Sequence, residues 1–381
     1  MRHLRLKNFK CFDDQTIPLS ALTVFCGRNG TGKSSAIQGL LLHEAARECS
    51  RRGVRDLSLN AVPGLALGTL NDVLPKSTFA SGKRTDKIVI EFGSTAKLDI
   101  VAFDTGDMPE NANYVRVSSP VGRSGKFDPW QFVFLSAERI GPRASQEKLS
   151  NATDADLRLG EHAEHLAEVL TRFERRRIRR QLMHPAERSK GKSANELLTR
   201  NVELWMSEIF GPLQIRSMSN GPYAPPSLQI RDSKGDTDWV IPTNYGFGVT
   251  YCLPVIVGCL LLAKNGLIVI DSPEAHLHPD AQTQVGKFLA WMAASGVSVL
   301  VETHSDHIVD GIRLAIGQED WPLESEECLF INFEKDAQGK VQVHPIKVRK
   351  DGSLDRWPRG FFDQQTINLR ALANFRHGRR S

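Results

Sequence analysis

The segment from Gly27 to Ser34 constrains the fold of this chain more than any other stretch. It reads Gly-Arg-Asn-Gly-Thr-Gly-Lys-Ser and stands between a predicted strand, 21–26, and a helical pattern that includes Ile37 and Leu40. Glycines in such a turn let backbone N–H groups point inward around phosphate oxygens, and the start of a helix adds the positive end of its dipole. The segment therefore predicts an α/β fold with a phosphate-binding loop after a buried strand.

Two side chains of this loop have predicted roles with a nucleoside triphosphate. Lys33 is expected to bridge the β- and γ-phosphates, and the Ser34 hydroxyl is expected to ligate Mg²⁺. The sequence has no Asn-Lys-x-Asp motif for reading guanine, which favours ATP. The predicted nucleotide-binding residues of the loop are Gly27, Arg28, Asn29, Gly30, Thr31, Gly32, Lys33, Ser34 and Ser35.

A second motif combines a buried strand with acidic residues. The aliphatic run 267–270 ends in Asp271, and Ser-Pro-Glu-Ala-His-Leu-His-Pro follows it. Such a run is typical of a strand in a parallel sheet. We expect Asp271 to be the metal-side carboxylate, on a strand neighbouring that of the phosphate-binding loop, and Glu274 to be the second, catalytic carboxylate. The long separation between Lys33 and Asp271 disfavours a compact small-molecule kinase.

A third motif follows one strand later. The apolar run 297–301 leads into Glu-Thr-His304-Ser305-Asp306. A histidine at the carboxyl end of a strand, where α/β sheets bind ligands, could hydrogen-bond the γ-phosphate and report its loss. The alternative is a helix N-cap formed by Ser305 or Asp306, with an incidental histidine. We predict that Glu274, Asp271 and His304 form the catalytic set.

A second glycine turn precedes an apolar helix predicted for 251–263. Gly246, Gly248 and Thr250 place two glycines and a hydroxyl at the start of this helix, which makes another anion-receptive turn. Gly246 could equally be an ordinary turn residue.

The order of these motifs resembles the ABC-type ATPase heads of the SMC/RecF/OLD class. It is most similar to prokaryotic predicted AAA-family ATPases with an uncharacterised C-terminal extension, in which stretches similar to 134–143 and 357–364 recur. The resemblance implies a P-loop NTPase with an ABC-ATPase-like head, an antiparallel β layer and a helical insertion. It also implies a homodimer whose heads sandwich two ATP molecules, with Gly246, Gly248 and Thr250 contacting the γ-phosphate across the interface.

Two positions depart from the pattern of that class. Ser272 stands where a glutamate usually follows the strand aspartate, and Thr250 stands where serine is more usual. Glu274 could take the glutamate's role, or hydrolysis could be slow. The leading hypothesis is a Mg²⁺-dependent ATPase that gates or drives a DNA-related effector in genome maintenance or anti-phage defence. The alternatives are a nucleotide-gated scaffold with little hydrolysis and a RecF-like DNA-repair ATPase.

The expected organisation has four parts. Residues 1–150 hold the phosphate-binding loop and paired antiparallel strands within 86–103. Residues 151–215 form a helical insertion with an apolar stripe, residues 216–345 complete the head, and residues 346–381 form the extension. The apolar stripe consists of Leu159, Ala163, Leu166, Leu170 and Phe173.

Basic residues between Arg172 and Lys192 suggest a partner. Several are expected on a helix, and 183–193 is expected to be a loop. The cluster could bind DNA through its phosphates, bind a partner protein, or have no such role. OLD-type proteins carry a nuclease domain after the histidine motif, but no clustered acidic set follows His304 here. We therefore expect no nuclease activity in this chain and a separate effector polypeptide.

Composition excludes other classes of protein. Of the 381 residues 40% are apolar, and 18 Phe and 6 Trp argue against intrinsic disorder. The six cysteines form no C-x-x-C pair, which disfavours a zinc site or a disulfide framework. The longest apolar run, around 255–263, is shorter than the roughly 20 residues that cross a bilayer. We expect a cytoplasmic protein without a membrane partner.

Overall fold

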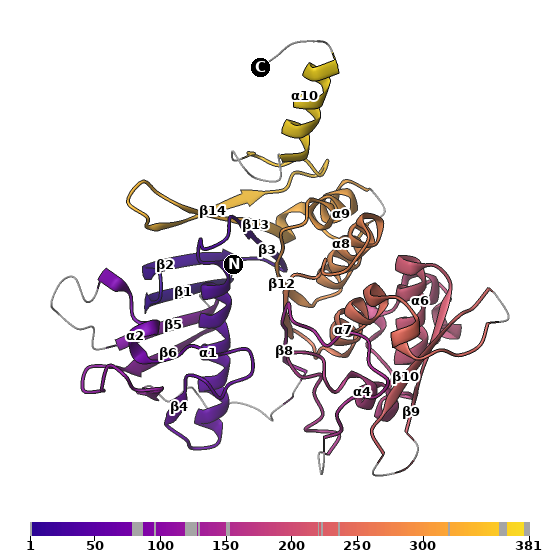
Figure 1. Cartoon of the computed structure of the whole chain (residues 1–381), viewed down its shortest axis with the longest axis horizontal. Helices are drawn as coiled ribbons and strands as arrows, with labels where there is room; N and C mark the ends of the chain where they lie inside the picture. The colour runs from indigo at the N-terminus through magenta and orange to yellow at the C-terminus, as the bar shows by residue number, and fades with distance from the viewer. Residues whose placement is uncertain are drawn as a thin grey trace.

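The computed structural model describes residues 2–77, 87–94, 97–118, 128, 130–149, 153–219, 221, 224–234, 237–318, 321–357 and 364–376. Its centre is a six-stranded sheet with the order β14-β13-β3-β12-β11-β8 (Figure 1). Neighbouring strands from β13 to β8 run parallel, and β14 runs antiparallel to β13. The strands are β3 (Leu22–Gly27), β8 (Phe132–Leu135), β11 (Leu267–Asp271), β12 (Ser298–Glu302), β13 (Cys328–Lys335) and β14 (Val341–Lys347).

The predicted strands 267–270 and 297–301 are confirmed as the parallel neighbours β11 and β12. Their position relative to β3 differs from the prediction. We expected the strand of Asp271 to neighbour the strand of the phosphate-binding loop, but β12 lies between β3 and β11. The carboxylate on the neighbouring strand is therefore Glu302, which is in register with Asp271 on one side and Phe25 on the other. Buried apolar runs look alike in a sequence, so they do not reveal strand order.

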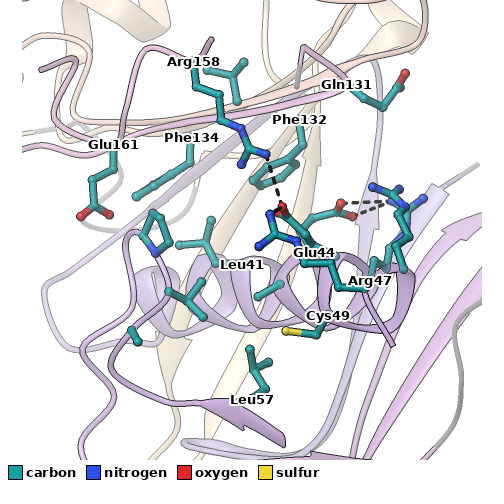
Figure 2. A pocket seen from close by; sticks show the side chains of 18 of the residues that line it. Leu41, Glu44, Arg47, Cys49, Leu57, Gln131, Phe132, Phe134, Arg158 and Glu161 are labelled. Atoms are coloured by element: carbon teal, nitrogen blue, oxygen red, sulfur yellow. Dashed lines mark hydrogen bonds and ion pairs between the residues drawn. The ribbon is translucent and has the colours of Figure 1, made fainter. Parts of the chain in front are cut away.

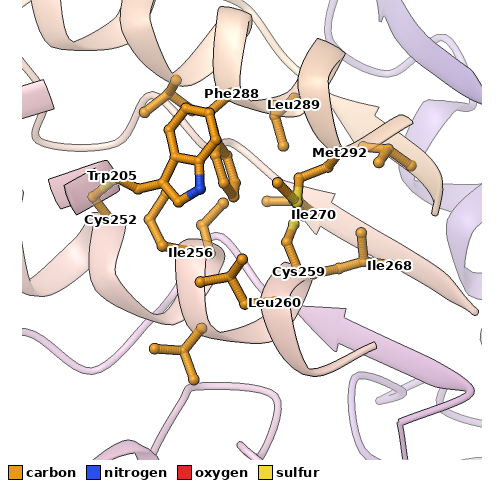
Figure 3. Packing of buried hydrophobic residues seen from close by; sticks show 14 of the residues in the cluster. Trp205, Cys252, Ile256, Cys259, Leu260, Ile268, Ile270, Phe288, Leu289 and Met292 are labelled. Atoms are coloured by element: carbon orange, nitrogen blue, oxygen red, sulfur yellow. The ribbon is translucent and has the colours of Figure 1, made fainter. Parts of the chain in front are cut away.

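Successive side chains of each strand point to opposite faces of this sheet, and both faces are buried. Val24 faces a cluster formed with helices, and Phe25 faces a second cluster. On the helical face, Trp205 and Phe288 stack edge to face, in the same buried cluster as Ile270 (Figure 3). The helices in this cluster are α4 (Leu166–Arg172), α6 (Leu198–Phe210), α7 (Phe247–Leu261), α8 (Pro279–Ala294) and α9 (Asp306–Gly317).

The other face is covered by α1 (Lys33–Arg51) and a second six-stranded sheet of order β2-β1-β5-β6-β7-β4. Figure 1 shows α1 alongside this antiparallel sheet. The predicted antiparallel pair within 86–103 is confirmed from residue 87 onward; residue 86 lies outside the described residues. The remaining elements are β1 (Arg2–Phe9), β2 (Phe12–Leu19), β4 (Asp56–Ser58), α2 (Leu70–Val73), β5 (Lys87–Ser94), β6 (Lys97–Asp104) and β7 (Tyr114–Val117).

The inserted region packs on the helical face and continues beyond the predicted limit. Helix α6 contacts α7 and α8, and both α4 and α6 contact β9 (Leu213–Met218). Strand β9 pairs antiparallel with β10 (Ser227–Asp232). The predicted boundary between residues 215 and 216 therefore falls inside β9, because the ladder with β10 holds the whole strand together.

Only part of the predicted helix in this region forms. Ala163 has a φ of 60° and interrupts the helical pattern, so α4 begins at Leu166. Helix α4 ends at Arg172, and Arg177 lies in an isolated β-bridge with Leu197, so the prediction of a basic helix is wrong beyond Arg172. The predicted loop 183–193 contains the short helix α5 (Pro185–Arg188) and a 3₁₀ turn, Gly191–Ser193.

The C-terminal part begins with β14 at the edge of the central sheet. Helix α10 (Gln364–Arg376) follows and stands away from the rest of the molecule (Figure 1). Its Leu369 and Leu372 side chains are exposed. Within the described ranges, none of the helices combines the length and the apolar character needed to cross a membrane.

Candidate functional site

The loop after β3 turns sharply at three glycines. Their φ angles are positive, 128° at Gly27, 74° at Gly30 and 107° at Gly32, in the region where other residues are strained. A Cβ atom on Gly27 would lie 2.3 Å from the carbonyl oxygen of Phe333 in β13. The turn therefore depends on glycine, and α1 begins directly after it.

Lys33 is folded back into this loop. Its Nζ atom donates hydrogen bonds to the carbonyl oxygens of Gly27 and Arg28, both at 3.0 Å, and the residue is 3% exposed. The Thr31 hydroxyl donates to the same Arg28 carbonyl at 2.7 Å. An ammonium group is thus held at the mouth of the loop by backbone oxygens, and it lies 3.6 Å from Glu302 Oε1.

Glu302 is a site residue that sequence reasoning missed. The Ser34 hydroxyl lies 3.1 Å from its Oε2 and 3.3 Å from its Oε1. Burial raises the pKa of this carboxyl to about 7 and the charge of Asp271 adds to the effect, whereas Lys33 and Ser34 oppose it. The sequence held one signal for it: Glu302 directly follows a buried apolar run, as Asp271 does.

The turn after β11 is held by a buried arginine that we had not assigned a role. Arg139 is 2% exposed, and its guanidinium donates to the carbonyl oxygens of Ser136 at 2.8 Å, Asp271 at 2.8 Å and Ser272 at 2.7 Å. The Ser272 hydroxyl donates to Asp271 Oδ1 at 2.9 Å. Arg139 therefore ties the end of β8 to the end of β11 and fixes the backbone that carries Asp271.

Glu274 joins the loops that follow β11 and β12. Its Oε2 accepts a hydrogen bond from the Thr303 hydroxyl at 2.7 Å, and its Oε1 accepts one from the backbone N–H of His304 at 2.8 Å. Both carboxylate oxygens are thus engaged, and they fix the position of the residue that carries the imidazole.

His304 lies at the surface as a residue, but its imidazole is partly desolvated and interacts electrostatically with three of the predicted residues. This partial burial lowers its pKa most, and the Lys33 charge lowers it further, while Glu274 and Asp271 oppose them. His304 is therefore neutral at neutral pH. The structure thus brings Lys33, Asp271, Glu274 and His304 together at the carboxyl ends of β3, β12 and β11.

The alternative reading of this segment is confirmed for one residue. Ser305 is the N-cap of α9, and its hydroxyl accepts a hydrogen bond from the backbone N–H of Ile308 at 3.1 Å. The Ser305 cap and the exposed His304 can both form, because residues 303–305 lie between the end of β12 at Glu302 and the start of α9 at Asp306.

The second glycine turn lies against the loop that follows β11. Gly246 is the exposed N-cap of α7, and Phe247 next to it is 59% exposed. Gly248 approaches the His276 carbonyl so closely that a Cβ atom would lie 3.1 Å from that oxygen. Thr250 is 3% exposed, and its hydroxyl is buried without a hydrogen-bond partner. Gly246 and Phe247 thus face solvent, whereas the Thr250 hydroxyl faces the interior.

A cavity of about 530 Å³ lies elsewhere, between the C-terminal half of α1 and β8 (Figure 2). Leu41 and Phe134 belong to its apolar lining. Several of its charged residues pair with one another: Arg47 donates to Glu44 at 3.0 Å, and Arg158 to Glu48 at 3.3 Å. None of the predicted nucleotide-binding residues lines this cavity.

Several of the basic residues between Arg172 and Lys192 contact an acid or an aromatic ring within the chain. Arg177 pairs with Glu196 at 3.9 Å, and the Arg176 guanidinium lies 4.5 Å from the Phe173 ring centre. The basic residues that contact an acid or an aromatic ring are Arg172, Arg176, Arg177, Arg188 and Lys190.

The oxygen donors near the phosphate-binding loop suit a Mg²⁺ ion that is bound partly by phosphates and waters, rather than a metal bound by protein ligands alone. No group of three or more His, Cys, Asp or Glu side chains that could hold a metal is found among the described residues. Ser34, Asp271 and Glu302 nevertheless offer oxygen atoms beside the phosphate-binding loop. Mg²⁺ is usually held by one or two carboxylates, with phosphates and waters completing its octahedron. These residues fit a magnesium–nucleotide site.

Comparison with known proteins agrees with this architecture. A family model described as "AAA domain, putative AbiEii toxin, Type IV TA system" matches residues 22–310. A second model, described as a protein of unknown function (DUF3696), matches residues 323–372. An OLD nuclease of Thermus scotoductus is 24% identical over 395 residues, an alignment that covers 93% of this chain and 66% of that protein. The chain thus spans about two thirds of this relative.

Two solved structures share the fold. An SMC head bound to the C-terminal winged-helix domain of ScpA matches with a TM-score of 0.50 and 14% identity, over 91% of this chain and 98% of that chain. An SMC head domain with an extended coiled coil, bound to the C-terminal domain of ScpA from Pyrococcus furiosus, matches with a TM-score of 0.50 and 12% identity, over 98% and 100%. The predicted fold class, an α/β P-loop NTPase head with an antiparallel β layer, is confirmed.

Proposed function

Because this chain belongs to the AAA-domain family that matches residues 22–310, we propose that it binds ATP with Mg²⁺, hydrolyses it slowly, and uses the cycle to close and open a homodimer. The observation that supports the proposal most is the placement of Lys33. Its ammonium group is held by two loop carbonyls, beside Ser34 and the carboxylates that end β11 and β12. This is an arrangement for a triphosphate and its metal.

We assign the loop residues to the phosphates. The backbone turn at Gly30 and Gly32 would present N–H groups to phosphate oxygens, and the dipole of α1 favours their charge. Lys33 would exchange its two carbonyl contacts for the β- and γ-phosphates. Ser34 and Asp271 would hold Mg²⁺, which neutralises charge on the phosphates when it is bound.

Glu274 and His304 would act on the γ-phosphate side. Glu274 holds the His304 backbone through a hydrogen bond of 2.8 Å. A neutral imidazole can donate one hydrogen bond and accept another, so His304 can contact either a phosphate oxygen or the attacking water. Glu274 thereby becomes a positioning residue for His304 as well as the predicted second carboxylate.

A nucleotide-gated scaffold with little hydrolysis is the second candidate. Two observations favour it. Ser272 occupies the position where the ABC class usually has glutamate, and its hydroxyl donates to Asp271. Both oxygens of Glu274 are already engaged by Thr303 and His304, which leaves this carboxylate poorly placed to activate water.

The proposed dimer would use the exposed turn at the start of α7. Gly246 and Phe247 are exposed there, and the glycine adds a flexible anion-receptive backbone. The buried Thr250 hydroxyl would reach a nucleotide of the partner head only if α7 shifted, so Gly246 and Gly248 are the stronger candidates for that contact.

A separate effector completes the proposal. The SMC heads that share this fold are bound to ScpA domains, and the relative named OLD nuclease extends beyond the aligned region. By analogy, we propose that the head acts on another polypeptide in anti-phage defence or genome maintenance, in the cytoplasm. That this chain carries no nuclease activity remains a prediction. The RecF-like alternative requires ATP-dependent DNA binding.

The central experiment measures ATP binding and single-turnover hydrolysis for the wild type and Lys33→Ala. We expect Lys33→Ala to lose ATP binding, because its ammonium group is replaced by a methyl. Unchanged binding and turnover in this variant would reject the proposal. Glu274→Gln and Ser272→Glu then separate ATPase from scaffold: a scaffold has negligible wild-type turnover that Ser272→Glu raises, whereas an ATPase turns over ATP and loses turnover in Glu274→Gln.

A further inference from the structure

We propose that Glu302 is a direct ligand of the Mg²⁺ that accompanies the triphosphate and that it binds this ion together with Ser34. The inference rests on the proposed nucleotide binding and adds a residue to that same site. It assigns a role to a carboxylate outside the aspartate motif, at the end of β12 and two residues before His304.

Strand order places Glu302 closer to the phosphate-binding loop than Asp271. Glu302 ends β12, which is hydrogen-bonded to β3, whereas Asp271 ends β11, one strand further away. Neighbouring strands are about 4.8 Å apart, so each added strand moves a carboxylate by that amount. A metal ion bound to Ser34 is therefore within easier reach of Glu302.

The distance between the two oxygen atoms fits a shared metal. Adjacent ligands of an octahedral Mg²⁺ with bond lengths of about 2.1 Å lie about 3.0 Å apart. Ser34 Oγ and Glu302 Oε2 are 3.1 Å apart, and Oε1 is 3.3 Å away. The hydrogen bond thus holds the two oxygens at the spacing that two neighbouring metal ligands need.

The local charges leave room for a cation. Glu302 is 4% exposed, and the one hydroxyl of Ser34 can donate to only one carboxylate oxygen at a time. The other compensation is the Lys33 ammonium group at 3.6 Å. Asp271 adds a second negative charge in register on the adjacent strand. Once Lys33 turns to the phosphates, the two carboxylates need another positive charge, which Mg²⁺ supplies.

A different explanation is that Glu302 serves only as the counter-ion that holds Lys33. The two roles predict different responses to metal. A counter-ion affects the loop whether or not Mg²⁺ is present, whereas a ligand affects the concentration of Mg²⁺ that ATP binding requires. The test therefore measures binding as a function of metal rather than turnover.

The first experiment titrates Mg²⁺ into full-length protein with ATP and records ATP binding by calorimetry. We expect Glu302→Gln to raise the Mg²⁺ concentration for half-maximal binding about tenfold or more, because losing even an outer-shell partner of a metal ligand typically costs about 10–100-fold in metal affinity. ATP binding in EDTA should not fall. Asp306→Asn, which removes the same charge at the first turn of α9, should change the Mg²⁺ requirement less than about twofold.

The second experiment changes the ligand chemistry at the same position. Glu302→Cys and Glu302→Ser are compared in a Cys11→Ser background, because the Cys11 thiol packs against Gly32 of the loop. Thiolates prefer soft metals such as Cd²⁺ to Mg²⁺. We expect Cd²⁺ to restore ATP binding to Glu302→Cys at least tenfold better than to Glu302→Ser.

The outcomes separate this inference from the proposed function. If the wild type binds no ATP with Mg²⁺, the proposed function itself fails. If the wild type binds but Glu302→Gln keeps the wild-type Mg²⁺ requirement, Glu302 is not a ligand. An equal shift in Asp306→Asn, or equal Cd²⁺ responses of the cysteine and serine variants, also overturns the inference. Thermal unfolding without nucleotide checks that each variant is folded.

Discussion

Two glutamates of this protein are almost completely buried, and their surroundings differ in kind. Glu187 in the inserted region is 1% exposed and accepts hydrogen bonds from Lys190, Arg200 and the backbone N–H of Asn195. Glu302 at the phosphate-binding loop is 4% exposed, with one hydroxyl, one ammonium group and a second carboxylate beside it. The two carboxylates are buried to a similar degree, but Glu187 has more hydrogen-bond donors and positive charges around it than Glu302 has.

The pKa values express this difference. The Asn195 N–H and the Lys190 ammonium lower the pKa of Glu187 to about 2. Burial and the Asp271 charge raise the pKa of Glu302 to about 7. A carboxylate with complete compensation stabilises the fold, whereas one without it is set up to receive a cation. The comparison therefore separates the structural role we assign to Glu187 from the metal-binding role we propose for Glu302.

The largest effect is expected at the structural carboxylate. Glu187→Gln should lower the free energy of unfolding by about 2–3 kcal/mol, because the buried side chain loses charge-assisted hydrogen bonds from the half-exposed Lys190 and Arg200 side chains. Chemical denaturation measures this. Glu196→Gln, in an exposed pair with Arg177, is the matched control and should cost less than about 1 kcal/mol. Equal losses in both variants would contradict the structural role of Glu187.

The stabilisation by Glu187 also has a predictable pH dependence. Its folded pKa is below the ordinary value of 4.5, so the stabilisation is present above pH 4.5 and is lost as pH falls toward 2. The wild type and Glu187→Gln should therefore converge in stability between pH 4.5 and pH 2. A difference that stays constant over this range would contradict the assignment.

The opposite pH dependence is expected for Glu302 without nucleotide. Between pH 4.5 and about 7 the folded protein holds a proton that the unfolded chain has released, so wild-type stability falls as pH rises. A shift of this size corresponds to about 3 kcal/mol, reduced in practice because Glu302→Gln also removes the partner of Lys33. We expect the free energy of unfolding of Glu302→Gln, relative to that of the wild type, to rise by about 1–2 kcal/mol between pH 5 and pH 8. Thermal and urea unfolding across this range would show no gain if the comparison is wrong.

An effect of similar size is expected from Arg139→Lys. The planar guanidinium donates to three carbonyls, and a single ammonium group cannot reach all three. We expect a loss of about 1–2 kcal/mol together with weaker Mg²⁺·ATP binding, since the backbone of Asp271 loses its support. A loss of stability with unchanged nucleotide binding would restrict Arg139 to a structural role.

The smallest effect is expected on the basic surface. Arg175→Gln with Arg177→Gln should change stability by less than about 0.5 kcal/mol, because Arg177 is 80% exposed in its side chain and makes only a 3.9 Å ion pair. Salt-dependent DNA binding of the wild type and this double variant tests the DNA prediction. Binding that weakens and loses part of its salt dependence would favour a nucleic-acid partner, and unchanged binding would exclude these residues.

Much of the site could be predicted from residue types and spacing. The glycine turn, Lys33 and Ser34 are adjacent in the chain, so a short motif is enough to identify them. Asp271 and His304 were found because each follows an apolar run, and in parallel strands such ends meet at one edge. The start of helix α4 was not predicted, because Ala163 adopts a left-handed backbone conformation that alanine rarely shows.

The sequence by itself determined the class of fold, the phosphate-binding loop and the strands that carry the acids, since these depend on local pattern and on which side chains must be buried. Only the tertiary structure decided that β12 separates β3 from β11, that Arg139 holds the turn after Asp271, and that Glu302 contacts Ser34. These features depend on pairing between segments far apart in the chain. Such pairing is set by the packing of the whole sheet rather than by the composition of any one strand.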